Sequence, residues 1–545
     1  MRNIFFISFL VITFSCSCDK AGRKSFTMSG PDSLAFRQAE MNSQLAGEAF
    51  SRCMHFVEGW LEYADSATGL IPRNLSDGRS YWNAQDAGAD NYPFMVLTSA
   101  VLDEQLFEGK MKQILDTERE LTSRIGPLPD DYSFESQDFR REEVDMDAII
   151  FGTSEYMKDG LLPVTEYLGP SPWSDRLLEM LDELEHHMDV QESFDGRITA
   201  IEEINGELLQ VLSRMYWFTG EEKYLDWAVT IGDHYLLGGH HPTRDLEVLR
   251  IRDHGCEIIA GLSELYFTVE RTRPDKAEKY RPSINGMFDR ILEIGRNDDG
   301  LFYNQVNPQT GEVLDAGTAD TWGYTFNGYL TLYQMERNEK YMDAIRKAIG
   351  GLTRSYRNFD WEHGSADGYA DAIEGGLNLL NRIPDDGLSE WIDSEIKVMW
   401  GKQQDNGIVE GWHGDGNFAR TSLMYGLWKT GGLTVKPWHD ELGFGAVQRG
   451  DSLYVYISSA ESWEGTVCFD TERHRVYLNL PFDYPRINQF PEWYTVRLEE
   501  IYLHTDCETG SVRQVSGKLL REGLPVQLAG GESKRFILTG LSSVQ

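Results

Sequence analysis

Acidic, histidine and tryptophan side chains gather in seven short clusters along this chain. The clusters are Tyr81–Tyr92, Glu142–Asp147, Glu202–Asn205, Arg252–Gly255, Asp320–Tyr324, Trp361–Tyr369 and Trp412–Arg420. Crowding of carboxyl groups in an aromatic-walled cleft raises the pKa of some of them, because burial and like charge disfavour the ionised form. A protonated carboxyl beside an ionised one is the pair that cleaves glycosidic bonds.

Each cluster supplies residue types that suit such a pocket. We expect Asp90, Asp145, Asp147 and His254 to be catalytic. The residues expected to bind substrate are Trp82, Asp86, Glu203, Asn205, Arg252, Asp253, Asp320, Trp322, Tyr324, Asp367, Trp412, His413 and Arg420. Tryptophan rings can stack on sugar faces, and histidines can act as acid–base groups or bind hydroxyls.

Every one of these assignments has a plainer alternative. Asp and Asn at a helix start cap free backbone N–H groups. The tryptophans could equally be core residues, and His254 could be a hydrogen-bonded core histidine. Arg252 and Arg420 either clamp a substrate carboxylate or neutralise the neighbouring Asp253 and Asp415. Capping alone requires neither Trp nor His, so the recurrence of both favours a pocket.

The elements that must position the clusters are paired helices. From about residue 33 to 432 the apolar positions recur at helical spacing, as in Ile204–Phe218, and predict about a dozen to fourteen helices. A hairpin join at Tyr216–Asp226 recurs at Tyr333–Asp343 and, with a longer turn, from Tyr266 to Tyr280. Repeated hairpins form a solenoid or a closed ring. Long acidic and aromatic connections favour a toroid of six or seven hairpins, with the clusters at the starts of its inner helices.

The tail, residues 433–545, changes character. Short β-branched and aromatic runs at Leu453–Ile457, Thr466–Phe469, Arg475–Leu478 and Arg535–Leu538 predict a small β-sandwich. Its expected role is to pack against the toroid, with carbohydrate binding as the alternative.

The N-terminus predicts export. Arg2 precedes a short apolar run, Ile4–Phe14, and then Cys16 and Cys18, either of which could be the acylated residue of a lipoprotein. We assign residues 1–18 to this signal and 19–32 to a linker, and expect a periplasmic or cell-surface location. A plain cleaved signal is the alternative. No later stretch is apolar enough for a membrane helix.

Composition excludes other classes of protein. The net charge of −37 repels phosphate backbones, so a nucleic-acid partner is not expected. The four cysteines beyond the signal form no CxxC pair and no histidines cluster at zinc-ligand spacing, so we expect no metal and no cofactor. Cys468 and Cys507 could pair in an oxidising compartment.

The hairpin joins, the acidic helix starts and the β-rich tail together resemble the six-hairpin glycosidase superfamily. The resemblance covers roughly residues 35–430 and implies an (α/α)6 toroid followed by a β-sandwich. Within the superfamily the chain is most similar to unsaturated glucuronyl hydrolases and exo-β-glucuronidase-like enzymes. By position, Asp90 and either Asp145 or Asp147 match the two catalytic Asp of the unsaturated glucuronyl hydrolases, although the flanking residues differ.

We therefore expect a glycoside hydrolase that acts on a carbohydrate, with a uronic-acid-bearing glycan as the favoured substrate. A polysaccharide lyase or a sugar epimerase on the same toroid is the first alternative, and a lyase could use Tyr324, His254, Asn205 and Arg252. A non-catalytic glycan-binding lipoprotein is the second.

Overall fold

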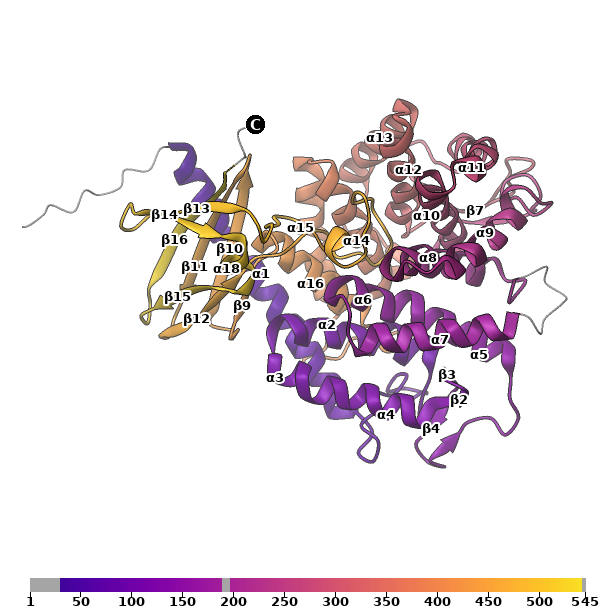
Figure 1. Ribbon diagram of the computed structural model, residues 1–545, viewed down its shortest axis with the longest axis horizontal. Helices are drawn as coiled ribbons and strands as arrows, with labels where there is room; N and C mark the ends of the chain where they lie inside the picture. The colour runs from indigo at the N-terminus through magenta and orange to yellow at the C-terminus, as the bar shows by residue number, and fades with distance from the viewer. Residues whose placement is uncertain (1–29, 189–196, 542–545) are drawn as a thin grey trace, which may run out of the picture.

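The computed structural model describes residues 30–188 and 197–541. The predicted signal, residues 1–18, lies outside the described residues. A large helical body carries a smaller β-rich body at one side, with the long helix α1 (Gly30–Tyr63) running between them (Figure 1). Among the described residues, no helix is both long and apolar enough to cross a membrane.

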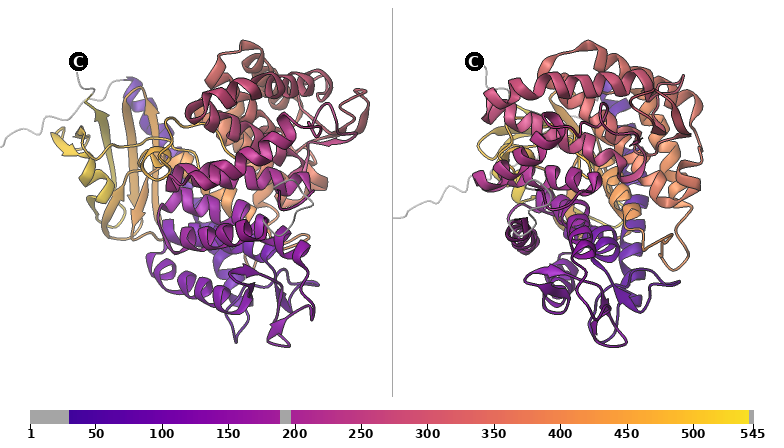
Figure 2. Two further views of the ribbon diagram at one scale, coloured as in Figure 1. Left: turned by 45° about the vertical axis from the view of Figure 1, so that its right-hand side comes forward. Right: turned by 90° about the vertical axis from the view of Figure 1, so that its right-hand side faces the viewer.

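The helical body is a closed ring of hairpins (Figure 2). Its inner segments are α2 (Tyr92–Leu102), α5 with α6 (Met146–Glu155, Leu162–Leu168), α8 (Glu202–Thr219), α10 (Glu257–Thr272), α12 (Trp322–Glu336), α14 (Ala366–Arg382) and α16 (Asn417–Thr430). Its outer segments are α1, α3 with α4 (Glu104–Leu106, Lys112–Thr122), α7 (Pro172–Met188), α9 (Glu222–Leu236), α11 (Pro274–Ile294), α13 (Glu339–Ser355) and α15 (Asp386–Trp400). Each inner segment packs on the next, and α16 packs on α2 to close the ring.

The predicted helical toroid followed by a β-sandwich is confirmed. The described residues supply seven inner segments, which is the larger of the two hairpin numbers that the periodicity allowed. The ring is tight in places: a Cβ on Gly323 of α12 would lie 2.3 Å from the Cα of Gly375 on α14. Neighbouring inner helices there touch backbone to backbone, which only glycine permits.

The recurring hairpin join holds the two helices of a hairpin together and also contacts the neighbouring hairpin. Across the turn, Tyr216 Oη on α8 donates to Glu222 Oε1 on α9 at 3.5 Å, and Tyr333 Oη on α12 donates to Glu339 Oε1 on α13 at 3.3 Å. Towards the preceding hairpin, Lys223 Nζ and Tyr224 Oη on α9 both donate to Asp182 Oδ1 on α7, each at 2.7 Å. Similar contacts link Tyr280 on α11 to Asp233 on α9 and Lys340 on α13 to Asp289 on α11. The join therefore also ties successive outer helices to each other.

Short irregular elements interrupt the ring at its mouth. Two π-helical segments, η1 (Ala84–Asn91) and η3 (Tyr156–Leu161), and two 3₁₀ turns, η5 (Asp253–Cys256) and η6 (Trp361–Gly364), precede or interrupt inner helices. A third π-helical segment, η2 (Phe107–Met111), joins α3 to α4. The connections between the helices contain short strands: β1 (Tyr81–Trp82), β2 (Ser123–Ile125), β3 (Leu128–Pro129), β4 (Tyr132–Ser133), β5 (Asp138–Phe139), β6 (Leu249–Arg250), β7 (Tyr303–Val306) and β8 (Val313–Thr318).

The C-terminal body has two antiparallel sheets. One has the order β10-β11-β16-β13-β14 and the other β15-β12-β9. The strands are β9 (Thr434–Lys436), β10 (Leu442–Arg449), β11 (Ser452–Ser459), β12 (Trp463–Cys468), β13 (Ile501–Asp506), β14 (Val512–Ser516), β15 (Leu524–Leu528) and β16 (Ser533–Gly540). The short helices α17 (Arg473–Val476) and α18 (Gly517–Glu522) join them. Cys468 and Cys507 are free thiols.

One predicted strand is wrong. Arg475–Leu478 was expected to be a strand, but α17 and the turn after it occupy this stretch. The reason lies in packing, because Leu478 buries its side chain with Phe267 and Tyr484 against the ring rather than inside the sandwich. The chain continues to the ring's interior, where Asn488 donates from Nδ2 to Asp159 Oδ1 at 2.8 Å. The second body thus supplies part of the floor of the ring.

Candidate functional site

The starts of the inner helices surround one mouth, where two hollows lie in series. The outer cavity has a volume of about 490 Å³ and the inner one about 40 Å³. Asp90, Asp253, His254, Asp367 and His413 line both. The two hollows are therefore a single pocket that narrows towards the interior of the ring.

The outer cavity is strongly acidic. Its lining includes nine carboxyl groups: Asp86, Asp90, Glu155, Glu203, Asp253, Glu362, Asp367, Glu410 and Asp415. His254, His363 and His413 are the basic groups there, and the described residues that line it include no Lys or Arg. The rim carries Trp412, which is 76% exposed and whose ring lies 4.8 Å from the Arg73 guanidinium carbon.

The acids follow a regular pattern along the inner segments. Five segments each carry two acids four residues apart: Asp86 and Asp90, Glu155 and Asp159, Glu203 and Glu207, Asp253 and Glu257, and Asp367 and Asp371. Side chains at this spacing lie on one face of a helix, one turn apart. The second acid is therefore carried deeper, and Asp159, Glu257 and Asp371 line the inner cavity.

Asp90 and His413 form one wall of the pocket. Asp90 lies in η1, a π-helical segment of the kind often found at functional sites. His413 Nε2 lies 3.6 Å from Asp90 Oδ2, and His413 Nδ1 contacts the Gly414 carbonyl at 3.0 Å. Burial raises the pKa of Asp90, His413 lowers it, and Asp159 and Asp367 raise it, with a net value of about 7. The pKa of this carboxyl is therefore raised from its usual acidic range towards neutrality.

His413 keeps its positive charge in this setting. Burial lowers its pKa, but the charges of Asp90, Asp86 and Asp367 raise it to about 9. Asp86 is itself held by Arg73 Nε at 2.5 Å and by Asn83 Nδ2 at 2.6 Å. This wall thus combines a fixed carboxylate, a cationic imidazole and a protonatable acid.

The floor is an ionic network around Arg420. Its guanidinium contacts Asp371 Oδ1 at 2.7 Å and Glu374 Oε2 at 2.8 Å, and donates to Asn488 Oδ1 at 2.8 Å. Tyr324 Oη lies 2.8 Å from Asp371 Oδ1 and 2.9 Å from Glu374 Oε2, within hydrogen-bond distance of both. Burial raises the pKa of Asp371 to about 6 and that of Glu374 to about 7, although Arg420 lowers both. Arg420 is therefore committed to internal partners.

His254 stands on the opposite side of the pocket, among carboxylates. Its Nδ1 lies 3.7 Å from Glu155 Oε2 and 4.0 Å from Glu207 Oε1. Behind it, Lys158 Nζ binds Asp159 Oδ1 at 2.6 Å and Glu257 Oε1 at 2.5 Å. Burial raises the pKa of Asp159, but Lys158 and His254 lower it to a net value of about 2.

The structure brings most of the predicted site residues together. Those that line one or both hollows are Asp86, Asp90, Glu203, Asp253, His254, Tyr324, Asp367, Trp412, His413 and Arg420. Asp320 is buried, and the charges of Asp371, Glu362 and Asp367 help burial to raise its pKa. Asp320 therefore lies close to the pocket acids without lining either hollow.

Asp145 and Asp147 lie elsewhere. Both are exposed at the start of α5 and line neither hollow, and Asp145 Oδ1 caps the helix by accepting from Ala148 N at 3.2 Å. The capping alternative explains Asp145, so the prediction of a catalytic acid at either position is corrected. The pocket acids of this segment are Glu155 and Asp159, further along the chain.

Four further predicted residues are also outside the pocket lining. Trp82 and Trp322 are buried in the core, where Trp82 packs edge-on against Tyr156. Asn205 is buried and donates to backbone carbonyls near the start of α8, at 2.8 Å to Ile201. Arg252 is half-buried and lines neither hollow. The structure therefore does not bring these four side chains into the pocket lining.

Several residues of the pocket were missed from the sequence. They are Glu155, Lys158, Asp159, Glu207, Glu257, Asp371, Glu374, Asn417, Ile487 and Asn488. The spacing of two acids four residues apart could have identified five of them, because it repeats on five inner segments. The contribution of Asn488 from the second body had no signal in the sequence.

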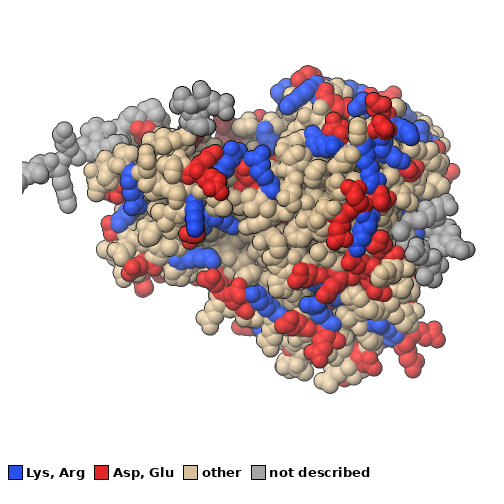
Figure 3. All heavy atoms as spheres, in the orientation of Figure 1, with Lys and Arg blue, Asp and Glu red and all other residues tan. Residues whose placement is uncertain are grey.

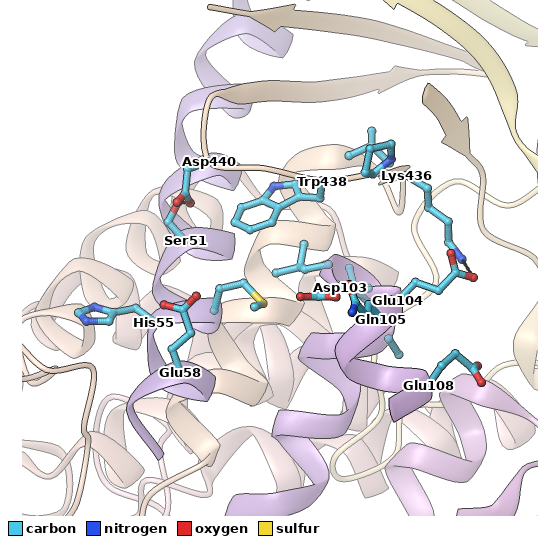
Figure 4. A pocket seen from close by; sticks show the side chains of 16 residues that line it. Ser51, His55, Glu58, Asp103, Glu104, Gln105, Glu108, Lys436, Trp438 and Asp440 are labelled. Carbon is cyan, nitrogen blue, oxygen red and sulfur yellow. Dashed lines mark hydrogen bonds and ion pairs between the residues drawn. The ribbon is translucent and has the colours of Figure 1, made fainter. Parts of the chain in front are cut away.

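A larger hollow of about 1200 Å³ lies elsewhere, between α1, the end of α2 and the segment before β10 (Figure 4). Its acids, such as Glu58, Asp103 and Asp440, come from outer helices and connections. At 1.5 Å per residue, the twelve positions from Asp90 to Leu102 on η1 and α2 separate it from the acidic mouth by about 18 Å. It is a separate groove against the second body.

Comparison with known proteins finds likeness in structure only. No family model matches the sequence, and a search of curated proteins finds no match. Among solved structures, an α-1,6-mannanase from Salegentibacter sp. HEL1_6 is 10% identical, with a TM-score of 0.40 over 69% of this chain and 98% of that one.

Two other similar structures cover a smaller share of this chain. Unsaturated glucuronyl hydrolase from Bacillus sp. GL1 is 14% identical, with a TM-score of 0.36 over 52% of this chain and 86% of that one. Cellobiose 2-epimerase from Bacillus thermoamylovorans B4167 is 12% identical, with a TM-score of 0.37 over 48% and 84%. Such identities and TM-scores say nothing of activity, so the function is inferred from this chain's own residues.

Proposed function

We propose that this protein is a glycoside hydrolase that cleaves neutral sugar units in its acidic pocket. The observation that carries the proposal is the pairing of a protonatable buried acid with nearby carboxylates in one cavity. Asp90 has a pKa of about 7, and the charge of Asp367 contributes to raising it. Two carboxyl groups whose environments separate their pKa values are what a glycosidase requires.

Asp90 is the proposed general acid and Asp367 the second carboxylate. Asp90 gives its proton to the glycosidic oxygen that leaves. Asp367, whose Oδ1 accepts from Asn417 Nδ2 at 2.7 Å, supports the addition of water at the anomeric carbon, directly or through a covalent intermediate. The reaction consumes one water and yields two sugars. Trp412 at the rim offers an exposed ring on which a sugar can stack.

The charge of the pocket argues against the predicted uronic acid. Recognition of a substrate carboxylate is usually a task for Arg or Lys. Arg420 is bound to Asp371, Glu374 and Asn488, and the described lining of the outer cavity has no Lys or Arg. Nine carboxyl groups face three histidines in the outer cavity, and the cationic His413 already lies 3.6 Å from Asp90, so a neutral glycan is the proposed substrate. The absence of Lys and Arg from the described lining of that cavity also disfavours a uronate lyase.

A sugar epimerase is the second candidate. His254 and His413 line the same hollows, and removal and return of a proton at one carbon requires two such groups. The two reactions leave different isotopic records. An epimerase run in D₂O places deuterium on carbon, whereas a hydrolase run in H₂¹⁸O places one ¹⁸O in the product.

The test is a panel of neutral and uronic-acid oligosaccharides incubated in the two labelled waters and analysed by mass spectrometry. We expect cleavage of neutral members with one ¹⁸O per bond, and loss of cleavage in Asp90→Asn and Asp367→Asn. Carbon-bound deuterium without cleavage would replace the hydrolase by the epimerase. Binding of glycans without either product would replace it by a glycan-binding protein.

We also propose that the chain is exported and lipid-anchored, because of the basic start, short apolar run and cysteines at its N-terminus. Labelling of cells with a fatty-acid analogue tests this. The label should disappear in a Cys16→Ala/Cys18→Ala double variant and remain in a Cys53→Ala variant. Label retained by the double variant would rule out this anchor.

A further inference from the structure

Four acid and imidazole side chains converge behind the wall that His254 forms. Glu155, Asp159, Glu207 and His254 each place one donor atom within 4.8 Å of the others. They come from α5, η3, α8 and η5, so three neighbouring inner segments of the ring supply them. Three carboxylates and one imidazole are a donor set that divalent cations bind in proteins.

Two of these residues, Glu207 and Asp159, have carboxyl oxygens that accept no hydrogen bond. Glu207 is fully buried, and neither of its carboxyl oxygens has a hydrogen-bond partner. Asp159 Oδ1 accepts hydrogen bonds from Lys158 and Asn488, but Asp159 Oδ2 has no hydrogen-bond partner, and the residue is 6% exposed. Buried carboxylate oxygens without partners are costly, and either a bound proton or a bound cation removes that cost.

The local charges favour a cation. The Lys158 charge is already matched by Glu257 at 2.5 Å as well as by Asp159. Glu155 and Glu207 add two carboxyl groups, whose pKa values burial raises, and Glu203 Oε1 lies only 4.0 Å from His254 Nδ1. The acids therefore outnumber the cations on this side of the pocket.

The spacing and orientation of His254 fit a metal ligand. A divalent cation bound at about 2.0 to 2.5 Å holds adjacent donors about 3 to 4 Å apart, and His254 Nδ1 lies 3.7 Å from Glu155 and 4.0 Å from Glu207. On the far side of the ring, His254 Nε2 faces Asp253 Oδ1 at 3.4 Å. A carboxylate in that position holds the proton on Nε2 and leaves Nδ1 free to bind metal.

Two other acid–histidine groups of the described chain suit a cation less well. In Asp86, Asp90 and His413, the Asp86 carboxylate is already bound by Arg73 and Asn83. In His474, Asp483 and Glu492, the Asp483 carboxylate pairs with Arg382 and Arg486, and His474 with Glu492 at 2.8 Å. Asp159 also has a cation beside it, Lys158 Nζ at 2.6 Å, so the feature that separates the proposed site from these two groups is Glu207, whose two buried oxygens have no hydrogen-bond partner.

We propose that Glu155, Asp159, Glu207 and His254 bind one divalent transition-metal cation of the Mn²⁺ or Zn²⁺ class. The imidazole donor favours this class over Ca²⁺ and Mg²⁺, which prefer oxygen ligands alone. Asp159 and His254 also line the inner cavity and Glu155 the outer one, so free coordination positions face the pocket. A sugar's hydroxyl pair could occupy them. Cation binding itself does not depend on the proposed hydrolase activity.

Metal binding is tested without substrate. The protein is stripped with a chelator and titrated separately with Mn²⁺, Zn²⁺, Ca²⁺ and Mg²⁺ by calorimetry, with Tm followed at each concentration. We expect one Mn²⁺ or Zn²⁺ per chain and a Tm that rises with its concentration. Glu207→Gln should weaken binding at least about tenfold, while Glu374→Gln, an equally buried glutamate on the other side of the pocket, should not. Glu155→Gln replaces Glu207→Gln if circular dichroism shows that the latter does not fold.

Bound Mn²⁺ also reports its ligands. Electron spin echo spectra should show one coordinated imidazole nitrogen, which disappears in His254→Gln and persists in His413→Gln. If the stripped protein binds neither Mn²⁺ nor Zn²⁺ more tightly than about 1 mM and Glu207→Gln raises the Tm, protons satisfy the carboxyls and the proposal is overturned. Loss of the nitrogen signal in His413→Gln instead would place the cation at Asp90 and also overturn it.

Discussion

Removal of the His413 charge should move the pH dependence of catalysis in a known direction. A general acid works in its protonated form, so activity should fall as the pH rises through the Asp90 pKa of about 7. His413 lowers that pKa by stabilising the Asp90 anion. In His413→Gln the anion loses this support, so the pKa rises and the alkaline fall moves to higher pH.

The size of the shift follows from the geometry. Two unit charges 3.6 Å apart, as His413 Nε2 and Asp90 Oδ2 are, attract by about 1 kcal/mol in water-like surroundings and about 5 kcal/mol at an effective dielectric constant near 20. At about 1.4 kcal/mol per pKa unit, this corresponds to a shift of roughly 1 to 3 units. Both side chains are mostly buried, so screening by solvent does not remove the effect.

Two measurements check it. The pH profile of kcat/KM on a cleaved oligosaccharide should show the alkaline limb at least about one unit higher in His413→Gln. Difference infrared spectra of the protonated carboxyl band report the Asp90 pKa directly, with Asp90→Asn as the reference. Asp90→Asn should itself lose about 10² to 10⁴ in kcat/KM. An unmoved limb together with an unmoved carboxyl band in His413→Gln would refute the coupling, and a fully active Asp90→Asn would refute the general acid.

Three further outcomes are expected. Trp412→Ala should raise KM on oligosaccharides several-fold with little change in kcat, because the exposed rim ring contacts sugar and not the scissile bond; an unchanged KM would exclude stacking there. Asp145→Asn and Asp147→Asn should keep kcat/KM near that of the unaltered enzyme, because both carboxyls are exposed outside the pocket, and a large loss would restore them as candidates. Arg420→Met should cost about 3 to 5 kcal/mol of unfolding free energy in urea, because it leaves Asp371 and Glu374 buried without their cation. The control Arg475→Met, in an exposed pair with Glu472, should cost less than about 1 kcal/mol.

The helical ring could be predicted because its signals are local and repeated. Apolar positions at helical spacing, as along Ile204–Phe218, mark buried faces wherever a helix packs. The repeated Lys-Tyr join identified the hairpins, but the sequence did not indicate which residue the Lys and Tyr side chains bind. Asp182, which binds Lys223 and Tyr224, is about forty positions away on another outer helix. Periodicity shows that a face is buried and not which neighbour covers it.

The site could be predicted in outline for the same reason. The polar clusters do mark the mouth, because inner helices of a ring start on one side. The sequence did not show how deep along a helix each acid lies: Asp147 and Glu155 both belong to α5, but only Glu155 lines the pocket. The floor was not accessible either, since Asn488 arrives from the second body through a segment predicted to be part of a sandwich.

The buried acids of the described chain differ in whether an Arg or Lys side chain forms an ion pair with them. In the packing between helices, Arg176 holds Glu118 at 2.6 Å and Arg214 holds Glu264 at 2.6 Å, so buried charge there is neutralised within the fold. In the pocket, Glu207 is buried without a hydrogen bond and the outer lining has nine carboxyls without a Lys or Arg. Arg73 pairs with Asp86 and Arg250 with Asp253 in this lining, but the buried Glu207 beside it has neither a hydrogen bond nor a guanidinium partner, which destabilises the pocket. Buried carboxyls without partners are expected where a bound ligand, a proton or a cation completes the site. The difference between the paired acids of the helix packing and the unpaired Glu207 therefore favours the mouth of the ring as the place of the chemistry.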